Sequence, residues 1–309
     1  MNCILETANA KLNLALRVTG RREDGYHYLS MFNVLIDLCD HIELMKAKSE
    51  DLLSVSLSEV LEARLSLTEK AVLCSQQGNI VIKALKLFRE VSGVRDRVEI
   101  KIKKNIPLGG GLGGGSSDAA AVLRALLKLF QEYDLSRSVS DTLNMQSVKI
   151  GADIPFFIIE SRAAVVEGIG EILQPLSDNW LSGHEVVLII PEVACSTPEV
   201  YRIFRKLVSL PQSQKLNISD LKILKGSPVD LRGLLVNDLL AASLEVAPAI
   251  KPLYQELINF EDLAVGMTGS GSTLFAMNRG AAEISAIQAN SLLEVSGRYG
   301  ALCLRARIL

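Results

Sequence analysis

The sequence predicts an α+β protein of two domains, for three reasons. Its 309 residues exceed what one ordinary hydrophobic core serves, which favours two domains over a single large α/β barrel. Stretches that alternate apolar and polar residues, as strands do, occur beside stretches with the apolar spacing of helices. Apolar residues make up 49% of the chain and charged residues 22%, a balance typical of a globular protein with a sizeable core.

The N-terminal part of the chain is predicted to be rich in strands. Residues 3–18 alternate apolar and polar side chains, and the glycines of residues 20–25 favour a turn. Two further strands are expected at residues 31–38 and 40–44. The polar, serine-rich residues 47–77 are interpreted as a hairpin with connecting loops that carry little functional information.

A helix and a strand are predicted next. Apolar residues spaced as on one face of a helix predict a helix over residues 80–91, with Asn79 at its N-cap. Residues 98–103 alternate cleanly, so we expect a half-exposed strand that ends before Pro107.

Another helix is predicted shortly after this strand, and the second half of the chain alternates strands with helices. An apolar stripe over residues 119–130 predicts the helix, with Ser116 or Ser117 as its N-cap. Beyond it, strands are expected at residues 156–159, 163–166, 186–190 and 272–277, and helices at residues 230–242 and 281–295. A domain boundary near residue 160 would separate residues 1–160 from residues 161–309.

Composition argues against several classes of function. The formal net charge of −2 and the absence of basic clusters give no support for a nucleic-acid partner. Five scattered cysteines without a C-x-x-C pair and three distant histidines give none for a zinc site. No signal peptide or membrane-spanning segment is visible, so we expect a cytoplasmic protein without a membrane partner. The oligomeric state stays open.

A glycine-rich segment joins the strand at residues 98–103 to the helix at residues 119–130. Six glycines lie between positions 109 and 115, so the backbone N–H groups can approach a ligand closely. The helix that follows favours an anion at its N-terminus. The segment is therefore predicted to bind polyphosphate through Pro107, Gly109, Gly110, Gly111, Leu112, Gly113, Gly114, Gly115, Ser116 and Ser117.

Other interpretations of the glycines fit less well. A flexible linker would not connect a strongly alternating strand to a strongly amphipathic helix. A Walker A loop needs Lys after its last glycine, where this chain has Ser116. A Rossmann fingerprint is formally met by Gly109, Gly111 and Gly114 and is the second choice, although it lacks the early position and the acidic residue expected of it. The H-R-D and D-F-G elements of protein kinases are absent from the sequence.

The order of several motifs resembles the GHMP kinase superfamily, and within it the family of 4-diphosphocytidyl-2-C-methyl-D-erythritol kinases. The resemblance covers most of the chain and is weakest over residues 47–77 and 207–227. It rests on Ala10-Lys11-Leu12-Asn13-Leu14, Arg22-Glu23-Asp24-Gly25-Tyr26-His27, Gly109 to Ala119, Gly151-Ala152-Asp153-Ile154-Pro155, Glu167-Gly168-Ile169-Gly170-Glu171 and Met267-Thr268-Gly269-Ser270-Gly271.

The resemblance implies a two-domain fold, with a ribosomal protein S5 domain 2-like N-terminal domain and a ferredoxin-like C-terminal domain. It also implies ATP-dependent phosphorylation of the 2-hydroxyl of a cytidine-diphosphate-linked methylerythritol, in the non-mevalonate isoprenoid pathway. Mg²⁺ is expected together with ATP and is held mostly by phosphates and water. Its protein ligands stay open, with Ser117 as the best candidate.

Asp153 and Lys11 are the candidate catalytic residues. A carboxylate within reach of an alcohol can take its proton as the bond to phosphorus forms, although a helix or turn cap would explain Asp153 equally well. A single lysine beside a strand is usually solvated. The resemblance places Lys11 beside Asp153, where its charge would stabilise the transferred phosphoryl group.

The resemblance implies further contacts with both substrates. Asn13 shares a strand face with Lys11 and could orient the acceptor hydroxyls, and an aromatic ring beside an imidazole could stack on cytosine and hydrogen-bond its edge. A turn pair and a helix cap are the alternative interpretations of Tyr26-His27 and Asn79. The substrate contacts are assigned to Asn13, Tyr26, His27, Thr197, Tyr201, Thr268 and Gly269, and the adenine contact to Asn79.

Two alternatives to this function remain. One is another GHMP kinase acting on mevalonate, homoserine or a sugar, which Tyr26-His27 disfavours because those acceptors carry no base. The other is a catalytically silent, ligand-binding regulator, which Lys11 and Asp153 disfavour.

Overall fold

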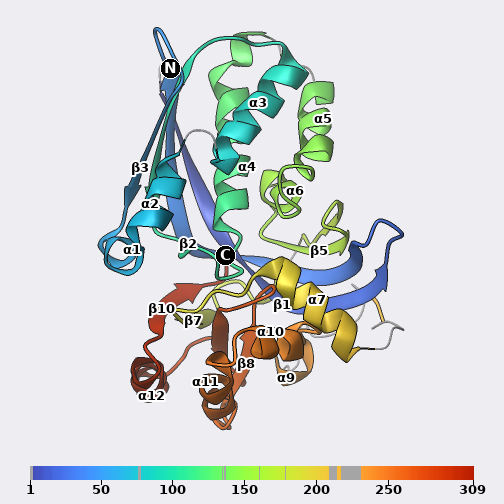
Figure 1. Cartoon of the computed structure of the whole chain (residues 1–309), viewed down its shortest axis with the longest axis vertical. Helices are drawn as coiled ribbons and strands as arrows, with labels where there is room; N and C mark the ends of the chain where they lie inside the picture. The colour runs from blue at the N-terminus through green and yellow to red at the C-terminus, as the bar shows by residue number, and fades with distance from the viewer. Residues whose placement is uncertain are drawn as a thin grey trace. The chain divides into compact units, whose positions relative to one another are not determined.

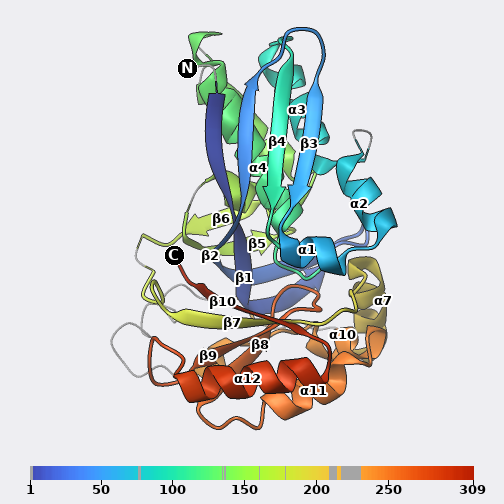
Figure 2. The same ribbon diagram turned by 90° about the vertical axis from the view of Figure 1, so that its left-hand side faces the viewer.

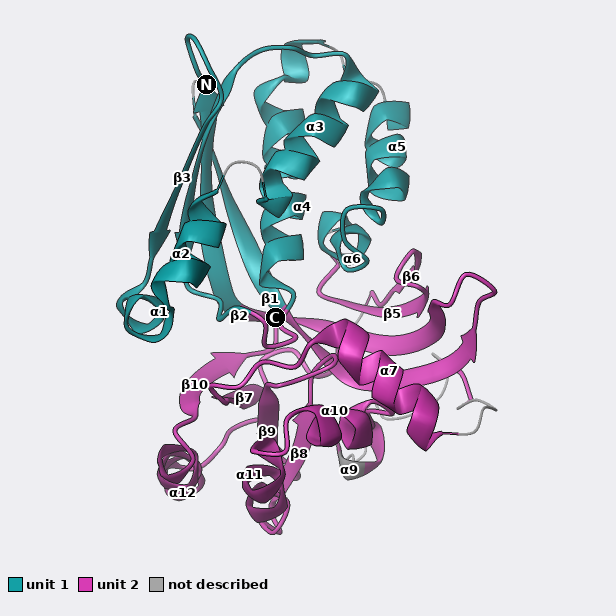
Figure 3. Ribbon diagram, in the orientation of Figure 1, with its two compact units in different colours: residues 1–10, 38–108, 113–160 teal, residues 11–37, 109–112, 161–309 magenta. Residues whose placement is uncertain are grey.

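The computed structural model describes residues 3–75, 78–133, 135, 137–159, 161–177, 179–208, 214–216 and 231–309. The chain divides into two compact units (Figure 3). Unit 1 comprises residues 1–10, 38–108 and 113–160, and unit 2 comprises residues 11–37, 109–112 and 161–309. Residues 11–37 and 109–112 thus group with residues 161–309, and the expected division into domains of residues 1–160 and 161–309 stays a prediction.

The strands of unit 1 are arranged around β4 (Val98–Lys104). The second half of β2 (His27–Lys46) pairs antiparallel with β4, and β3 (Leu52–Leu57) pairs with it in parallel. The strand β1 (Cys3–Arg21) also begins in this unit. Alternate residues of β4 are buried, which confirms the half-exposed strand expected from the sequence.

Helices cover one face of these strands, as α3 and α4 show in Figures 1 and 2. The helix α3 (Ile80–Ser92) begins after Asn79, whose side chain accepts the N–H of Val81 at 3.0 Å. Both the helix and its cap are therefore confirmed. The helix packs against α4 (Gly114–Leu129) and α5 (Arg137–Ser147), and these two helices in turn contact α6 (Ile154–Ile158). A 3₁₀ turn, η1 (Gln131–Tyr133), follows α4.

Three predictions for this half were wrong. Strands at residues 31–38 and 40–44 are confirmed, but the break expected between them is wrong: both belong to the single strand β2, which continues through Cys39 and the buried Asp40. Residues 47–77 form no hairpin: β3 pairs with β4, and the short helices α1 (Glu59–Arg64) and α2 (Leu67–Cys74) follow, with residues 76–77 outside the described part. The strand expected at residues 156–159 is part of helix α6, which a proline in its first turn favours.

Unit 2 contains two sets of paired strands. The first half of β2 pairs antiparallel with β5 (Ala163–Gly168), which pairs with β6 (Ile172–Pro175). The second set has the order β10-β7-β9-β8, with antiparallel neighbours throughout. Its members are β7 (Glu185–Ile190), β8 (Leu263–Met267), β9 (Leu274–Asn278) and β10 (Leu302–Arg307).

Helices of unit 2 pack on one face of the second sheet, as α11 (Ile250–Leu257) and α12 (Ala286–Arg298) show in Figure 2. Helices connect β7 to β8 and β9 to β10. Together with the strand order, these two connections give the ferredoxin-like arrangement that was expected. The remaining helices are α7 (Thr197–Leu207), α9 (Leu231–Leu234) and α10 (Leu240–Val246). The α+β class is confirmed.

The helices expected in the second half differ in their bounds. The helix expected at residues 230–242 is interrupted, because residues 235–239 separate α9 from α10; residue 230 and most of the segment 207–227 lie outside the described part. The other expected helix begins at Ala286, after a capping box between Ser285 and Gln288. Within the described residues, no helix has both the length and the apolar character needed to cross a bilayer.

Candidate active site

The backbone of the glycine loop, residues 109–115, presents donors rather than acceptors. In the described part of the chain, its N–H groups donate no hydrogen bond, whereas the carbonyl groups of residues 110–113 each accept one. The carbonyl of Leu112 accepts the N–H of Lys11 at 3.0 Å, and that of Gly111 accepts the hydroxyl of Thr268 at 3.2 Å. Free amides with occupied carbonyls suit an anion such as a polyphosphate.

Two positions of the loop require glycine because another segment lies against them. A Cβ on Gly110 would lie 2.4 Å from Oγ1 of Thr273, and a Cβ on Gly111 would lie 2.4 Å from the backbone oxygen of Thr268. Gly111 also has a φ of 78°, which side chains disfavour. Within unit 2, the second glycine turn, residues 268–271, therefore supports residues 109–112.

The first turn of α4 differs from the expectation in its cap. Gly113, with a φ of 73°, is the N-cap, so Ser116 and Ser117 lie inside the helix and the prediction that one of them caps it was wrong. Glycine adopts this left-handed conformation more readily than serine. The hydroxyl of Ser117 donates to the carbonyl of Asn9 at 2.7 Å and is buried, which leaves only its lone pairs for a cation.

A buried network in unit 2 contains Lys11 and Asn13. Lys11 donates to the side-chain oxygen of Asn13, whose amide donates in turn to Asn33 at 2.6 Å. The backbone N–H of Asn13 donates to the hydroxyl of Thr268 at 3.0 Å. The structure thus brings together three of the predicted residues, and it adds Asn33, which the sequence analysis missed. All four side chains are buried.

Asp153 lies in unit 1 and is half-buried at the start of α6. Asp153 is the N-cap residue of that helix, although its side chain makes no capping hydrogen bond with it, so the cap interpretation holds for the position and not for the carboxylate. Two residues earlier, a Cβ on Gly151 would lie 3.0 Å from Oγ of Ser116. The turn that carries Asp153 therefore lies against the first turn of α4, at the end of the glycine loop.

The rings of His27 and Tyr201 stack in unit 2, with centroids 4.9 Å apart and an interplanar angle of 20°. Phe204, which the sequence analysis missed, packs edge-on against His27 at 5.9 Å. His27 is buried, and its Nε2 has no hydrogen-bond partner in the described part of the chain. Burial, helped by the positive charges of Arg205 and Arg21, lowers the pKa of His27, so its imidazole is neutral at neutral pH.

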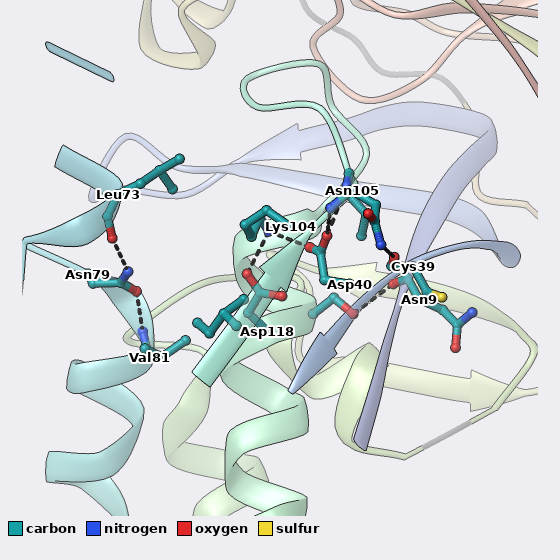
Figure 4. Close-up of polar contacts among 12 residues, drawn as sticks. Asn9, Cys39, Asp40, Leu73, Asn79, Val81, Lys104, Asn105 and Asp118 are labelled. Carbon is teal, nitrogen blue, oxygen red and sulfur yellow. Dashed lines mark hydrogen bonds and ion pairs between the residues drawn. The ribbon is translucent and has the colours of Figure 1, made fainter. Parts of the chain in front are cut away.

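Several other predicted residues have defined surroundings. Tyr26 is 63% exposed, so it is available to a ligand. The hydroxyl of Thr197 lies 2.8 Å from that of Ser270, within the second glycine turn. Asn79 bonds the N–H of Val81 and also donates to the carbonyl of Leu73 at 2.8 Å (Figure 4). Its capping role is thus observed, and an adenine contact stays a prediction.

The described residues contain no group of three or more His, Cys, Asp or Glu side chains that could hold a metal ion by themselves.

Comparison with known proteins gives a consistent result. Residues 79–161 match the family model described as the GHMP kinases N terminal domain. The 4-diphosphocytidyl-2-C-methyl-D-erythritol kinase of Alkaliphilus metalliredigens is 35% identical over 272 residues, 87% of this chain and 86% of the relative. That of Clostridium tetani is 36% identical over 275 residues, 87% of this chain and 88% of the relative. A crystal structure of 4-(cytidine 5'-diphospho)-2C-methyl-D-erythritol kinase is 28% identical, with a TM-score of 0.70 over 98% of this chain and 99% of that one.

Proposed function

Because this chain belongs to the family of 4-diphosphocytidyl-2-C-methyl-D-erythritol kinases, we propose that it transfers the γ-phosphoryl group of ATP to the 2-hydroxyl of that cytidyl alcohol. The products are the 2-phosphate and ADP, in the non-mevalonate isoprenoid pathway. Membership of the family makes the chain an ATP-dependent small-molecule kinase. The observation that carries the residue assignments is the glycine loop, where no N–H group donates a hydrogen bond within the described part of the chain while the carbonyls of residues 110–113 each accept one.

ATP is assigned to the glycine loop and to the N-terminus of α4. The loop amides would hydrogen-bond the phosphates, and the positive end of the helix dipole would favour their charge. Asn79 is the proposed adenine contact, and residues 1–160 are the proposed ATP-binding domain. Mg²⁺ bound together with ATP would neutralise part of the charge of the phosphates, and Ser117 is the side chain proposed to hold it.

The transfer step is assigned to Asp153 and Lys11. The carboxylate of Asp153 takes the proton of the acceptor hydroxyl while the oxygen forms its bond to the γ-phosphorus. The bond between that phosphorus and the bridging oxygen breaks, and ADP leaves. Lys11, fixed by Asn13, would stabilise the negative charge on the transferred group. Asn13, Thr197, Thr268 and Gly269 are the proposed contacts of the acceptor.

The cytidine end of the substrate is assigned to His27, Tyr201 and Tyr26. Nε2 of His27, which has no hydrogen-bond partner among the described residues, offers a hydrogen bond to the edge of the base, and the tyrosine rings offer stacking surfaces. Mevalonate, homoserine and sugar acceptors carry no base, so this cluster supports a cytidyl acceptor. Residues 161–309 are the proposed substrate domain, and the cytoplasmic location stays a prediction.

The test is ADP release from MgATP with 4-diphosphocytidyl-2-C-methyl-D-erythritol, for the wild type and for Asp153→Ala. Loss of a general base lowers kcat by about a hundredfold or more, whereas the affinity for MgATP should stay near that of the wild type. Asp141→Ala, which removes an exposed carboxylate from α5 of the same unit, is the matched control. No turnover by folded, ATP-binding wild type would overturn the acceptor, and full activity of Asp153→Ala would overturn the base.

A further inference from the structure

Three charged side chains of unit 1 are buried together. Lys104 is 2% exposed, Asp40 is 0% and Asp118 is 4%. Nζ of Lys104 lies 2.6 Å from the carboxylate of Asp118 and also donates to that of Asp40 (Figure 4). Removing one partner of a buried ion pair leaves an uncompensated buried charge, which is strongly destabilising, so the three residues depend on one another.

The cluster lies where the chain enters the glycine-rich segment. Lys104 is the last residue of β4, and a carboxylate oxygen of Asp40 accepts the N–H groups of Asn105 at 2.5 Å and Ile106 at 2.9 Å. These two residues lead directly into Pro107. Asn105 also donates its side-chain amide to the carbonyl of Cys39 at 2.7 Å (Figure 4). The start of the segment is therefore fixed at consecutive backbone positions.

The same cluster holds the other end of the segment. Asp118 follows the two serines in the first turns of α4, so its bond to Lys104 joins the helix to the end of β4. Packing reinforces this join, because a Cβ on Gly114 would lie 3.0 Å from Cγ2 of Ile106 and 3.5 Å from Nζ of Lys104. The two ends of the loop are thus held at a fixed separation by one buried ammonium group.

The charge state of the cluster follows from its burial. Burial raises the pKa of Asp118, the charge of Lys104 opposes this, Asp40 adds to it, and the result is a value of about 8. Burial alone would lower the pKa of Lys104, but the attraction of Asp118 and Asp40 outweighs it, and the pKa is raised. At neutral pH the lysine is charged and Asp118 holds a proton, which makes asparagine a close mimic of that residue.

We propose that Lys104, Asp40 and Asp118 are positioning residues that lock both ends of the glycine loop, so that its amides are held ready for the phosphates of ATP. The inference rests on the proposed assignment of that loop to ATP. Apolar residues of similar volume could stabilise the unit equally well. They could not accept the N–H groups of Asn105 and Ile106, nor could they fix the direction of the backbone that enters the loop.

Two substitutions at one position test the proposal. Asp118→Ala removes the tie to the helix and leaves the pair of Lys104 and Asp40 neutral, whereas Asp118→Asn keeps an oxygen for the lysine. Loss of one charge-assisted hydrogen bond predicts a Kd for MgATP about tenfold weaker in Asp118→Ala. Because Asp118→Asn keeps that bond, its Kd should stay within about twofold of the wild type. The KM for the cytidyl alcohol should be unchanged in both.

Isothermal titration with MgATP and thermal unfolding are measured on every variant. Arg89→Ala is the control, because it breaks a half-buried ion pair with Asp51 in the same unit, away from the loop, and should lower Tm without changing the Kd. If Asp118→Ala does the same, the cluster is merely structural and the proposal is overturned. Asp118→Leu, which fills the volume without an acceptor, replaces Asp118→Ala should the latter fail to fold.

A loop variant separates this inference from the assignment beneath it. Gly113→Ala places a side chain at a φ of 73° in the N-cap of α4 and should weaken MgATP binding by at least about fivefold. Unchanged binding in Gly113→Ala would overturn the assignment of ATP to the loop. Weakened binding in Gly113→Ala together with an unchanged Kd in Asp118→Ala would overturn the positioning role alone.

Discussion

Gly111→Ala is the substitution that tests the glycine loop most directly. A Cβ at this position would lie 2.4 Å from the backbone oxygen of Thr268, so the loop or the second glycine turn would have to shift. Overpacking of this kind costs about 1–3 kcal/mol. The φ of 78° at Gly111 adds about 1–2 kcal/mol for any L-residue.

Gly93→Ala separates the two costs. Gly93, the C-cap of α3, has the same φ of 78°, and a Cβ there would meet no atom within 4 Å. Gly93→Ala should therefore lose only the cost of its φ, about 1–2 kcal/mol of the free energy of unfolding, whereas Gly111→Ala adds the clash and displaces the loop amides. If those amides must return to their places to bind ATP, a clash of about 1–3 kcal/mol weakens the Kd for MgATP by about 5- to 150-fold.

The assay is isothermal titration with MgATP, together with urea unfolding of the wild type and both variants. Gly93→Ala should bind MgATP as the wild type does, at a lower free energy of unfolding. Wild-type affinity in folded Gly111→Ala would refute the assignment of phosphates to this backbone. Equal weakening in both variants would refute it as well, because the loss would then follow stability and not loop geometry.

Three further outcomes are expected. Asn33→Leu should lower kcat by about tenfold while leaving the Kd for MgATP unchanged, because the amide of Asn13 that holds Lys11 loses its acceptor. Asn33→Asp keeps an acceptor and should be less impaired. Equal kinetics in the two variants would contradict the reasoning. His27→Ala should raise the KM for the cytidyl alcohol by about tenfold without changing that for ATP, on the scale of one hydrogen bond, and a changed KM for ATP instead would refute the base contact. The pKa of Asp118 in the folded protein is about 8, against an ordinary 3.8. Its stabilising contribution is therefore complete below about pH 4 and is lost as pH rises through about 8. Tm measured from pH 5 to 9 should fall more in the wild type than in Asp118→Asn, and parallel profiles would show that Asp118 titrates normally.

The fold was predictable wherever a periodic apolar pattern met a recognisable boundary. The helix α3 was predicted because its stripe is regular and Asn79 caps it, and β4 because its alternation is unbroken. The prediction of a hairpin at residues 47–77 failed because β3 pairs with β4, a strand more than forty positions away along the chain. The local sequence pattern carries no information about such pairing. The prediction of a strand at residues 156–159 failed because four consecutive apolar residues fit a strand and a buried helix equally well.

The site was predictable where chemistry requires a particular residue type at a particular place. The glycines were found because close backbone approach excludes side chains, as the contact of Gly111 with Thr268 shows. His27 and Tyr201 were both assigned to the cytosine from the resemblance, but their direct stack was not predicted, because 174 positions separate the two residues along the chain.

The sequence did not point to Asn33 and Asp40, because both are polar residues inside a strand. Each interrupts the apolar run of β2, and such an interruption is ordinarily interpreted as the end of a strand or as an exposed position. Both side chains are fully buried and hydrogen-bonded. A polar residue that breaks an apolar strand without a turn residue beside it must find a buried partner, because burial without one costs more than folding can offset. Applied to β2, that rule requires a buried partner for Asp40. The structure supplies it as the ammonium group of Lys104, at the end of β4 and just before the glycines.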